Sequence, residues 1–251
     1  CKIEEERTMN KNSNTYIIIY TVVMVVLVAV LLSVTALSLQ PRQYANILGE
    51  KQNAILEAMG AEGNYTDVVK AYAVDAEGAV VESVSAEATL EMLFGLNDAF
   101  AAGTYPVFEN AQTGDVVVPL MGKGLWNDIW GYIALNSDMN TIKGIVLDHA
   151  GETPGLGAEI KTDKFEGSFV GKTIYEGSDL VSIEIVKGGA PEGAVHAIDA
   201  LSGATKTVQG VQAMLKNCLS YYDAFFKSKV APAEAEEVET ETNTENTESN
   251  E

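Results

Sequence analysis

The most prominent pattern along the chain is a long run of apolar positions near the N-terminus. Residues 16–39 include no charged side chain. At about 1.5 Å per residue, a helix of this length spans a hydrocarbon core about 30 Å thick with some tilt. The run is too long for the apolar region of a signal peptide, and it has no polar face as a buried amphipathic helix would. It therefore predicts one transmembrane helix.

Helical spacing of apolar residues continues after this span. The positions are Ile47, Leu48, Ile55, Leu56 and Met59. They predict an amphipathic helix within residues 44–59 that stands on the membrane. From about residue 65 to 117, short apolar runs alternate with turns such as residues 75–78, and this mixed pattern assigns no clear elements.

Strand-like patterns dominate from residue 116 onward. Residues 116–118, 129–135 and 141–147 read as strands, and the polar segment 136–140 between the last two predicts a hairpin loop. Residues 181–186 alternate between apolar and polar positions and predict a further strand. These patterns favour an α+β fold with an antiparallel sheet and flanking helices.

The last predicted element is a helix, because its apolar residues recur at intervals of three and four. They are Val208, Val211, Leu215, Cys218, Leu219, Tyr222 and Phe226. Beyond it, residues 229–251 are dominated by Ala, Pro, Glu, Thr and Asn. Such a composition buries too little apolar surface to fold. We therefore expect a disordered acidic tail.

Charge and cysteine content exclude several classes of protein. The net charge of −20 argues against nucleic acid as a partner, because phosphate contacts need Lys and Arg. The two cysteines, Cys1 and Cys218, form no C-x-x-C pair, which excludes an iron–sulfur cluster or structural zinc within this chain alone. Cys218 is expected to be a small buried core residue. Asp148, His149 and Glu152 resemble metal-ligand spacing, but no neighbour completes a set, so no metal site is predicted.

A run of small residues lies just before the last helix. Residues 199–205 read Asp-Ala-Leu-Ser-Gly-Ala-Thr and form an uncrowded loop that a modifying enzyme could enter. Thr205 lies at the predicted helix N-terminus, where unpaired amides and the helix dipole favour a phosphate. The alternative is an ordinary helix cap, in which Ser202, Thr205 or Thr207 closes the helix start.

The same run matches the D-x-x-S-G-A-T/S signature of the covalent FMN-binding domain family, which it resembles at every position. The resemblance implies FMN joined through its own phosphate to the hydroxyl of Thr205. A Mg²⁺-dependent flavin transferase that uses FAD would make this phosphodiester. By the same resemblance, Asp199, Ser202, Gly203 and Ala204 complete the flavinylation motif.

A second candidate segment is the glycine-rich run of residues 151–157. Three glycines and a proline make a bare backbone loop that can approach a flat ring or a phosphate, although a plain turn has the same composition. Beside the flavinylation motif, the family resemblance makes this run the expected flavin cradle. Its expected FMN contacts are Thr153, Leu156 and Gly157.

Two further residues are candidates for contact with FMN. Lys187 follows the predicted strand 181–186 and either brings a cation near the flavin or is simply an exposed strand-end lysine. Trp126, Trp130 and Tyr132 lie in or beside a strand, where aromatic residues are usually core. Of these, Trp126 is the one expected near the flavin.

A wider resemblance covers residues 9–226. Residues 14–32, 119–160, 181–191 and 196–215 resemble the family of C subunits of the Na⁺-translocating NADH:quinone reductase. The resemblance implies an electron-transfer subunit that is not catalytic alone. Electrons from NADH would reach its FMN through FAD and iron–sulfur centres of partner subunits. They would continue to a second covalent FMN and to quinone, coupled to Na⁺ export. The chain has no NADH fingerprint and supplies no catalytic acid, base or nucleophile.

The patterns and the resemblance together predict the organisation of the chain. It comprises a short cytoplasmic N-terminus (1–15), the transmembrane helix (16–39), a membrane-proximal helix with the first part of an extracytoplasmic domain (40–115), the FMN-binding domain (116–228) and the acidic tail (229–251). The expected location is the bacterial inner membrane, with the FMN domain on the periplasmic side. The expected partners are the other membrane, flavin and iron–sulfur subunits, the flavin transferase and the lipid bilayer.

Three other functions share some of these features. The G subunit of the related ion-pumping NADH:ferredoxin complex has the same Ser-Gly-Ala-Thr site, but residues 122–136 and 152–160 favour the quinone-reductase branch. A membrane-tethered scaffold would use the motif only as a helix cap. A stand-alone extracytosolic flavin shuttle would share the cofactor but not the partners.

Overall fold

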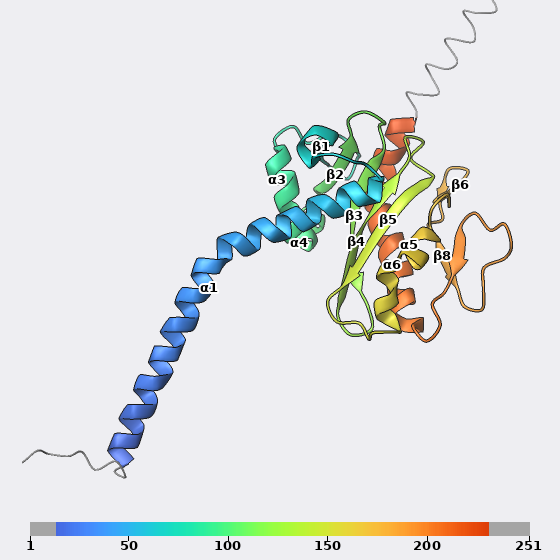
Figure 1. The fold of residues 1–251 in the computed structure, drawn as a ribbon. Coiled ribbons are helices and arrows are strands. Elements are labelled where there is room, and N and C mark those ends of the chain that lie inside the picture. The colour runs from blue at the N-terminus through green and yellow to red at the C-terminus, as the bar shows by residue number, and fades with distance from the viewer. Residues whose placement is uncertain (1–13, 231–251) are drawn as a thin grey trace, which may run out of the picture. The chain divides into compact units, whose positions relative to one another are not determined.

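The computed structural model describes residues 14–230 (Figure 1). The chain divides into two compact units, the first ending at Glu50 and the second beginning at Lys51. The predictions for residues 1–13 and 231–251 lie outside the described residues.

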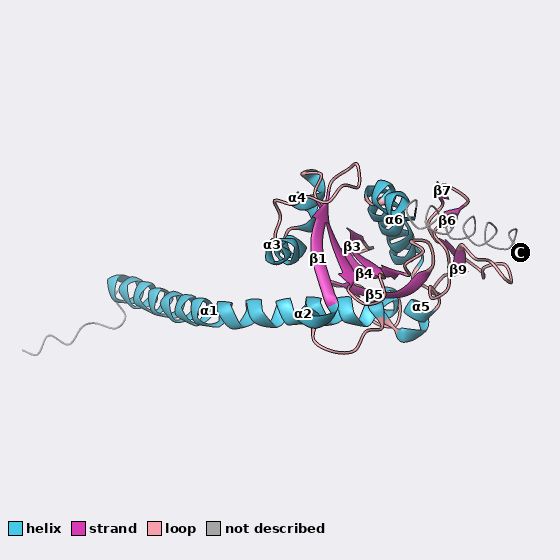
Figure 2. Cartoon of the chain, turned by 90° about the horizontal axis from the view of Figure 1, so that it is seen from above, coloured by secondary structure: helices cyan, strands magenta, loops and turns pink. Residues whose placement is uncertain are grey.

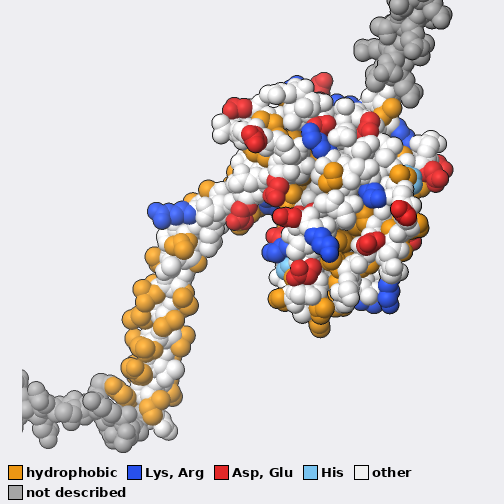
Figure 3. All heavy atoms as spheres, turned by 45° about the vertical axis from the view of Figure 1, so that its right-hand side comes forward, with side chains coloured by type: hydrophobic (Ala, Val, Ile, Leu, Met, Phe, Trp, Pro, Cys, Tyr) orange, Lys and Arg blue, Asp and Glu red, His pale blue; other side chains and the backbone are white. Residues whose placement is uncertain are grey.

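The first unit holds most of one long helix, α1 (Asn14–Met59). Its large apolar side chains from Ile17 to Ile47 are exposed, and Figure 3 shows apolar side chains covering the visible face of its N-terminal part. The hydroxyls of Thr21 and Thr35 donate to carbonyls one turn back, so these polar groups are satisfied within the helix. By length and composition α1 can cross a membrane, as predicted for residues 16–39. The helix predicted at 44–59 is the continuation of α1 and does not begin separately.

The second unit is built on a five-stranded antiparallel sheet in which neighbours in sequence are neighbours in space. Its strands are β1 (Val69–Val74), β2 (Tyr105–Asn110), β3 (Val116–Lys123), β4 (Asp128–Leu135) and β5 (Ile142–His149). The strands predicted at 116–118, 129–135 and 141–147 are confirmed. β3 continues through Pro119, which lies beyond the residues that pair with β2, so its missing N–H breaks no ladder bond there.

The hairpin loop predicted between β4 and β5 is also confirmed. The Asp138 carboxylate accepts hydrogen bonds from the amides of Asn140 and Thr141 at 2.9 and 2.8 Å. Met139 takes a left-handed conformation with φ of 54°. The side chain of Asp138 therefore supplies the acceptor that closes the turn.

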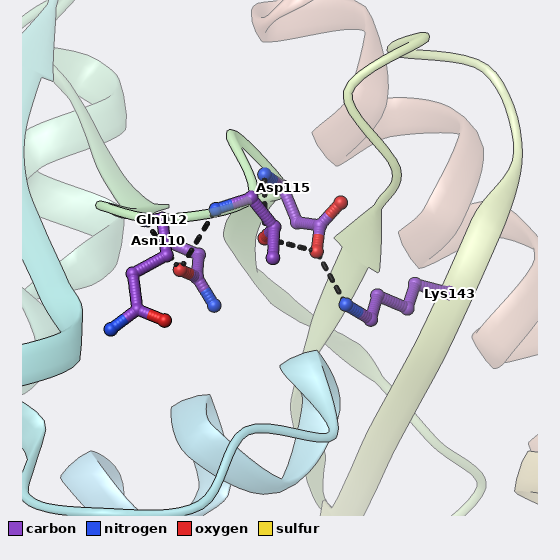
Figure 4. Close-up of polar contacts among 5 residues, drawn as sticks. Asn110, Gln112, Asp115 and Lys143 are labelled. Atoms are coloured by element: carbon purple, nitrogen blue, oxygen red, sulfur yellow. Dashed lines mark hydrogen bonds and ion pairs between the residues drawn. The ribbon is translucent and has the colours of Figure 1, made fainter.

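The turn between β2 and β3 is tied to the distant strand β5 (Figure 4). Asn110 accepts from the amides of Gln112 and Thr113, which closes the turn. The buried carboxylate of Asp115 accepts from the Thr113 hydroxyl and pairs with Lys143 of β5. This partly buried ion pair joins the β2–β3 turn to the edge of the sheet.

The predicted C-terminal helix is α6 (Thr205–Tyr221), and residues 223–230 are also helical. It packs along β3 on one face of the sheet (Figures 1 and 2). A Cβ at Gly122 would lie 2.7 Å from Met214, so glycine lets the helix approach the strand. Cys218 is buried there, as predicted, and its thiol donates to the Met121 carbonyl.

Smaller elements surround the sheet. Near β1 and β2 lie α2 (Tyr65–Val68), α3 (Ala86–Glu91), η1 (Met92–Phe94) and α4 (Leu96–Ala101); near β5 lie η2 (Gly157–Lys161) and α5 (Asp163–Gly167). Two short ladders complete the unit: antiparallel β6 (Tyr175–Glu176) with β7 (Asp179–Leu180), and parallel β8 (Glu184–Val186) with β9 (Ala197–Asp199).

The prediction of a strand at residues 181–186 was wrong for its first half. Only Glu184–Val186 form a strand, because Ser182 has a φ of 63° and interrupts the extended backbone. The amides of Val181 and Ser182 both donate to the Ile174 carbonyl at 2.9 Å. A contact across the β6–β7 hairpin therefore overrides the local alternation.

Candidate functional site

The glycine-rich run and the flavinylation motif, far apart in sequence, meet at the start of α6. The first follows β5, and the second begins at Asp199, the last residue of β9. A Cβ on Gly203 would lie 2.6 Å from Cδ2 of Leu156. Gly203 also has a φ of +77°, which residues with a side chain rarely adopt. Glycine at this position thus permits both the turn and the contact between the two segments.

Thr205 is exposed at the first position of α6. The N-cap residue is Ala204, and no side chain caps this helix start. The alternative prediction, a cap by Ser202, Thr205 or Thr207, is therefore wrong. Within residues 14–230, the structure records no hydrogen bond by the Thr205 hydroxyl. The first amides of a helix have no intrahelical acceptor and favour an anion. An accessible hydroxyl at this position fits a phosphate ester.

Glu152 is the buried polar residue beneath this region, with 4% of its surface exposed. Its carboxylate accepts from the Thr207 hydroxyl at 2.6 Å and from the Trp126 amide at 2.9 Å. Burial alone would raise the pKa of the carboxyl, but the bonds from Thr207 and from the backbone amides of residues 125–127 outweigh it and lower the pKa. Glu152 is therefore an anion in the folded domain.

The third glycine of the glycine-rich run makes room for this carboxylate. A Cβ on Gly157 would lie 2.5 Å from the Thr207 hydroxyl and 2.6 Å from a carboxylate oxygen of Glu152. Gly124, in the turn between β3 and β4, faces the other carboxylate oxygen equally closely. Neither glycine has a positive φ. Their role is close approach, whereas Gly155, with a φ of 75°, shapes the turn itself.

Trp126 lies in the β3–β4 turn, with 69% of its surface exposed. Its indole Nε1–H donates to the Thr153 hydroxyl at 3.1 Å. Leu125 and Leu156 are exposed as well. Trp126 is thus not a core residue, unlike Tyr132, which β4 buries as the sequence predicted. An exposed indole and two exposed leucines near the start of α6 suit a flat aromatic ligand.

The remaining predicted residues lie next to the motif. Val186 pairs with Asp199 across the parallel ladder β8–β9, so the exposed Lys187 follows directly beside the motif. The Asp199 carboxylate accepts from the Ala190 amide at 2.7 Å and holds the loop after Lys187. Within the described part of the chain, no ion pair is recorded for Lys187. Both interpretations of Lys187 therefore stay predictions.

Sequence reasoning missed Glu152 and Thr207 as parts of this site. Glu152 was noticed only beside Asp148 and His149, where the structure instead shows its amide donating to the His149 ring at 3.2 Å. A glutamate within a glycine-rich run, and a second threonine two positions after Thr205, were the available signals. Their pairing over a separation of 55 residues has no local signature.

Comparison with known proteins agrees with this site. A family profile described as the FMN-binding domain matches residues 124–220, which contain the glycine-rich run, the motif and most of α6. The fold and the site thus define an FMN-binding domain, and FMN is its cofactor.

Similar proteins identify the family more closely. The C subunit of the Na⁺-translocating NADH-quinone reductase of Vibrio alginolyticus is 32% identical, with 73% of this chain and 82% of the relative covered. The C subunit of Neisseria meningitidis serogroup B is 30% identical, with 82% and 90% covered. The crystal structure of the C subunit from Parabacteroides distasonis has a TM-score of 0.68 and 35% identity, over 75% of this chain and 96% of that one. For Shewanella oneidensis NqrC the TM-score is 0.64 and the identity 29%, over 74% and 99%.

The chain belongs to the family of C subunits of the Na⁺-translocating NADH-quinone reductase. The resemblance and the α+β fold predicted from the sequence are both confirmed.

Proposed function

We propose that this protein is the FMN-carrying subunit of a Na⁺-translocating NADH:quinone reductase. It passes electrons that originate from NADH towards quinone, and the complex couples this transfer to Na⁺ export. Family membership supports the proposal. The single structural observation that carries it is the exposed hydroxyl of Thr205 at the N-terminus of α6, which makes no recorded hydrogen bond to residues 14–230.

The FMN is held covalently as a phosphodiester of Thr205. The threonine oxygen forms a bond to the flavin-side phosphorus of FAD, the pyrophosphate bond breaks, and AMP leaves. The flavin transferase, with Mg²⁺, removes the hydroxyl proton. Support comes from the exposure of Thr205 and from the small residues Ser202, Gly203 and Ala204 beside it, of which only Ala204 is buried. An enzyme can approach such a loop without unfolding it.

The residues around Thr205 hold and orient this group. The free amides of the first turn of α6 bind the phosphate. Trp126 and Leu156 offer exposed apolar surface to the isoalloxazine ring, with Thr153 fixing the indole and Gly157 permitting the close packing below. Bound FMN supplies the redox chemistry, which these side chains lack.

Helix α1 anchors the protein in the bacterial inner membrane, and the FMN domain lies on the periplasmic side. The exposed apolar surface of α1 supports the anchor. The few basic residues near the span support the orientation, since Lys11 precedes it and a large acidic domain follows. Lipid, the other subunits of the reductase and the flavin transferase are the proposed partners.

Mass spectrometry of three proteins, each made together with the flavin transferase, tests the covalent site. The wild-type peptide that contains residues 202–206 should carry the added mass of one FMN. Thr205→Ala should lose this mass and the fluorescence of the denatured protein while the domain stays folded. Thr205→Ser keeps a hydroxyl and tests the tolerance of the transferase. A wild-type peptide without added mass would refute the covalent link.

A further inference from the structure

Glu152 connects three separate segments of the FMN site. Its carboxylate accepts from Trp126 in the β3–β4 turn and from Thr207 in the first turn of α6. Its own backbone belongs to the glycine-rich run. Thr207 lies two positions after Thr205, so the carboxylate lies directly beneath the helix turn that carries the modified residue.

The surroundings leave one position for this carboxylate. Gly124 and Gly157 approach its two oxygens so closely that a Cβ at either glycine would collide with them. The side chain is buried and accepts from the Thr207 hydroxyl and from the Trp126 amide. A carboxylate is an acceptor with several lone pairs, so it can satisfy all of these donors together.

We propose that Glu152 is a positioning residue of the FMN site and that its fixed negative charge lowers the reduction potential of the flavin. The proposal rests on FMN being carried at Thr205. Reduction adds negative charge to the flavin, and a nearby buried anion opposes that addition more strongly than a solvated one would. The same carboxylate holds the Trp126 turn and α6 at a set separation.

A purely structural role for Glu152 predicts a different outcome from this electrostatic one. Glutamine has nearly the shape of glutamate, and its amide can accept from the backbone while donating to the Thr207 oxygen. Glu152→Gln therefore preserves the packing but removes the charge. Glu152→Asp keeps the charge but is one methylene shorter, so it cannot reach both Trp126 and Thr207. The pair separates charge from position.

The first experiment measures the flavin midpoint potential in full-length protein made with the transferase. Glu152→Gln should shift the potential to more positive values, with covalent flavin retained. The control is Glu91→Gln, which removes one exposed charge on α3 and should leave the potential at the wild-type value. An unchanged potential in Glu152→Gln, an equal shift in the control, or a Glu152→Gln protein that does not fold would each overturn the proposal.

The second experiment needs no flavin and uses the Thr205→Ala background. Hydrogen exchange at the amides of residues 125–127 should be faster in Glu152→Asp than in the same background with Glu152. Equal protection would overturn the positioning role. A wild-type protein without covalent FMN would refute the proposed function instead, and the exchange measurement would still decide whether Glu152 fixes the turn.

Discussion

The side chain of Leu156 lies against the backbone of Gly203, with its Cδ2 only 2.6 Å from where a Cβ at residue 203 would stand. This contact joins the glycine-rich run to the flavinylation motif. Leu156 is itself exposed, so one side chain both contacts the motif and faces the place proposed for the flavin. The volume that a side chain at residue 203 would occupy, next to Leu156, is therefore part of the site.

Gly203→Ala should reduce covalent flavin loading. Gly171→Ala is the matched control, because Gly171 has a φ of +78° and nothing within 4 Å of a built Cβ. Both substitutions should lower the free energy of unfolding by about 1–2 kcal/mol through the left-handed backbone. Only Gly203→Ala displaces Leu156. The loaded fraction, read as in-gel flavin fluorescence per protein, should fall for Gly203→Ala alone; an equal loss in both variants would contradict the role of the contact.

Lys143→Met should destabilise the domain by leaving the buried Asp115 carboxylate unpaired. Lys143 is partly exposed, so we expect a loss of about 1–3 kcal/mol, below the full cost of breaking a buried pair. Lys161→Met removes an exposed pair with Asp148 at 3.6 Å and should cost about 0–1 kcal/mol. Urea unfolding of the detergent-solubilised protein measures both. Equal costs would show that burial of Asp115 does not matter.

Cys218 should resist thiol reagents in the native protein. Burial raises the pKa of its thiol from the usual 9 to about 11, despite the hydrogen bond with Met121 that favours the thiolate. At pH 8 the thiolate fraction is then about 0.1%. Alkylation of the peptide that contains Cys218 should require denaturation. Because the folded pKa is the higher one, this thiol stabilises the fold below pH 9, and its contribution is lost as the pH rises towards 11.

The proposed topology predicts that protease added to the outer face of spheroplasts removes the FMN domain. The exposed acidic domain after residue 40 is then accessible, while the N-terminus stays inside. Inverted vesicles are the control and should protect the domain. Digestion only in inverted vesicles would reverse the orientation.

The pattern of apolar and polar residues within a segment was sufficient to predict α1, three strands of the sheet and α6. The uncharged run at 16–39 lies within α1, the apolar runs at 116–118, 129–135 and 141–147 correspond to β3, β4 and β5, and the apolar stripe through Cys218 corresponds to α6. In α6 the buried residues repeat at the helical period, whereas residues 16–39 are apolar on every side and most positions of β3 and β4 are buried. In each case neighbouring residues alone indicate the element. The seven-residue motif likewise predicts Thr205 as the attachment site without any tertiary contact.

Only the tertiary structure decided how the parts of the site meet. Ser182 interrupts the strand predicted at 181–186, because its amide donates to the Ile174 carbonyl on the other side of the β6–β7 hairpin. Glu152 is a buried anion because Thr207, 55 residues away, and the β3–β4 turn supply its donors. Such hydrogen bonds depend on which segments the fold brings together, and the periodicity of apolar residues within one segment does not predict this. The sequence alone thus predicts which residue carries the cofactor, whereas long-range packing determined the buried carboxylate and the contacts beneath that residue.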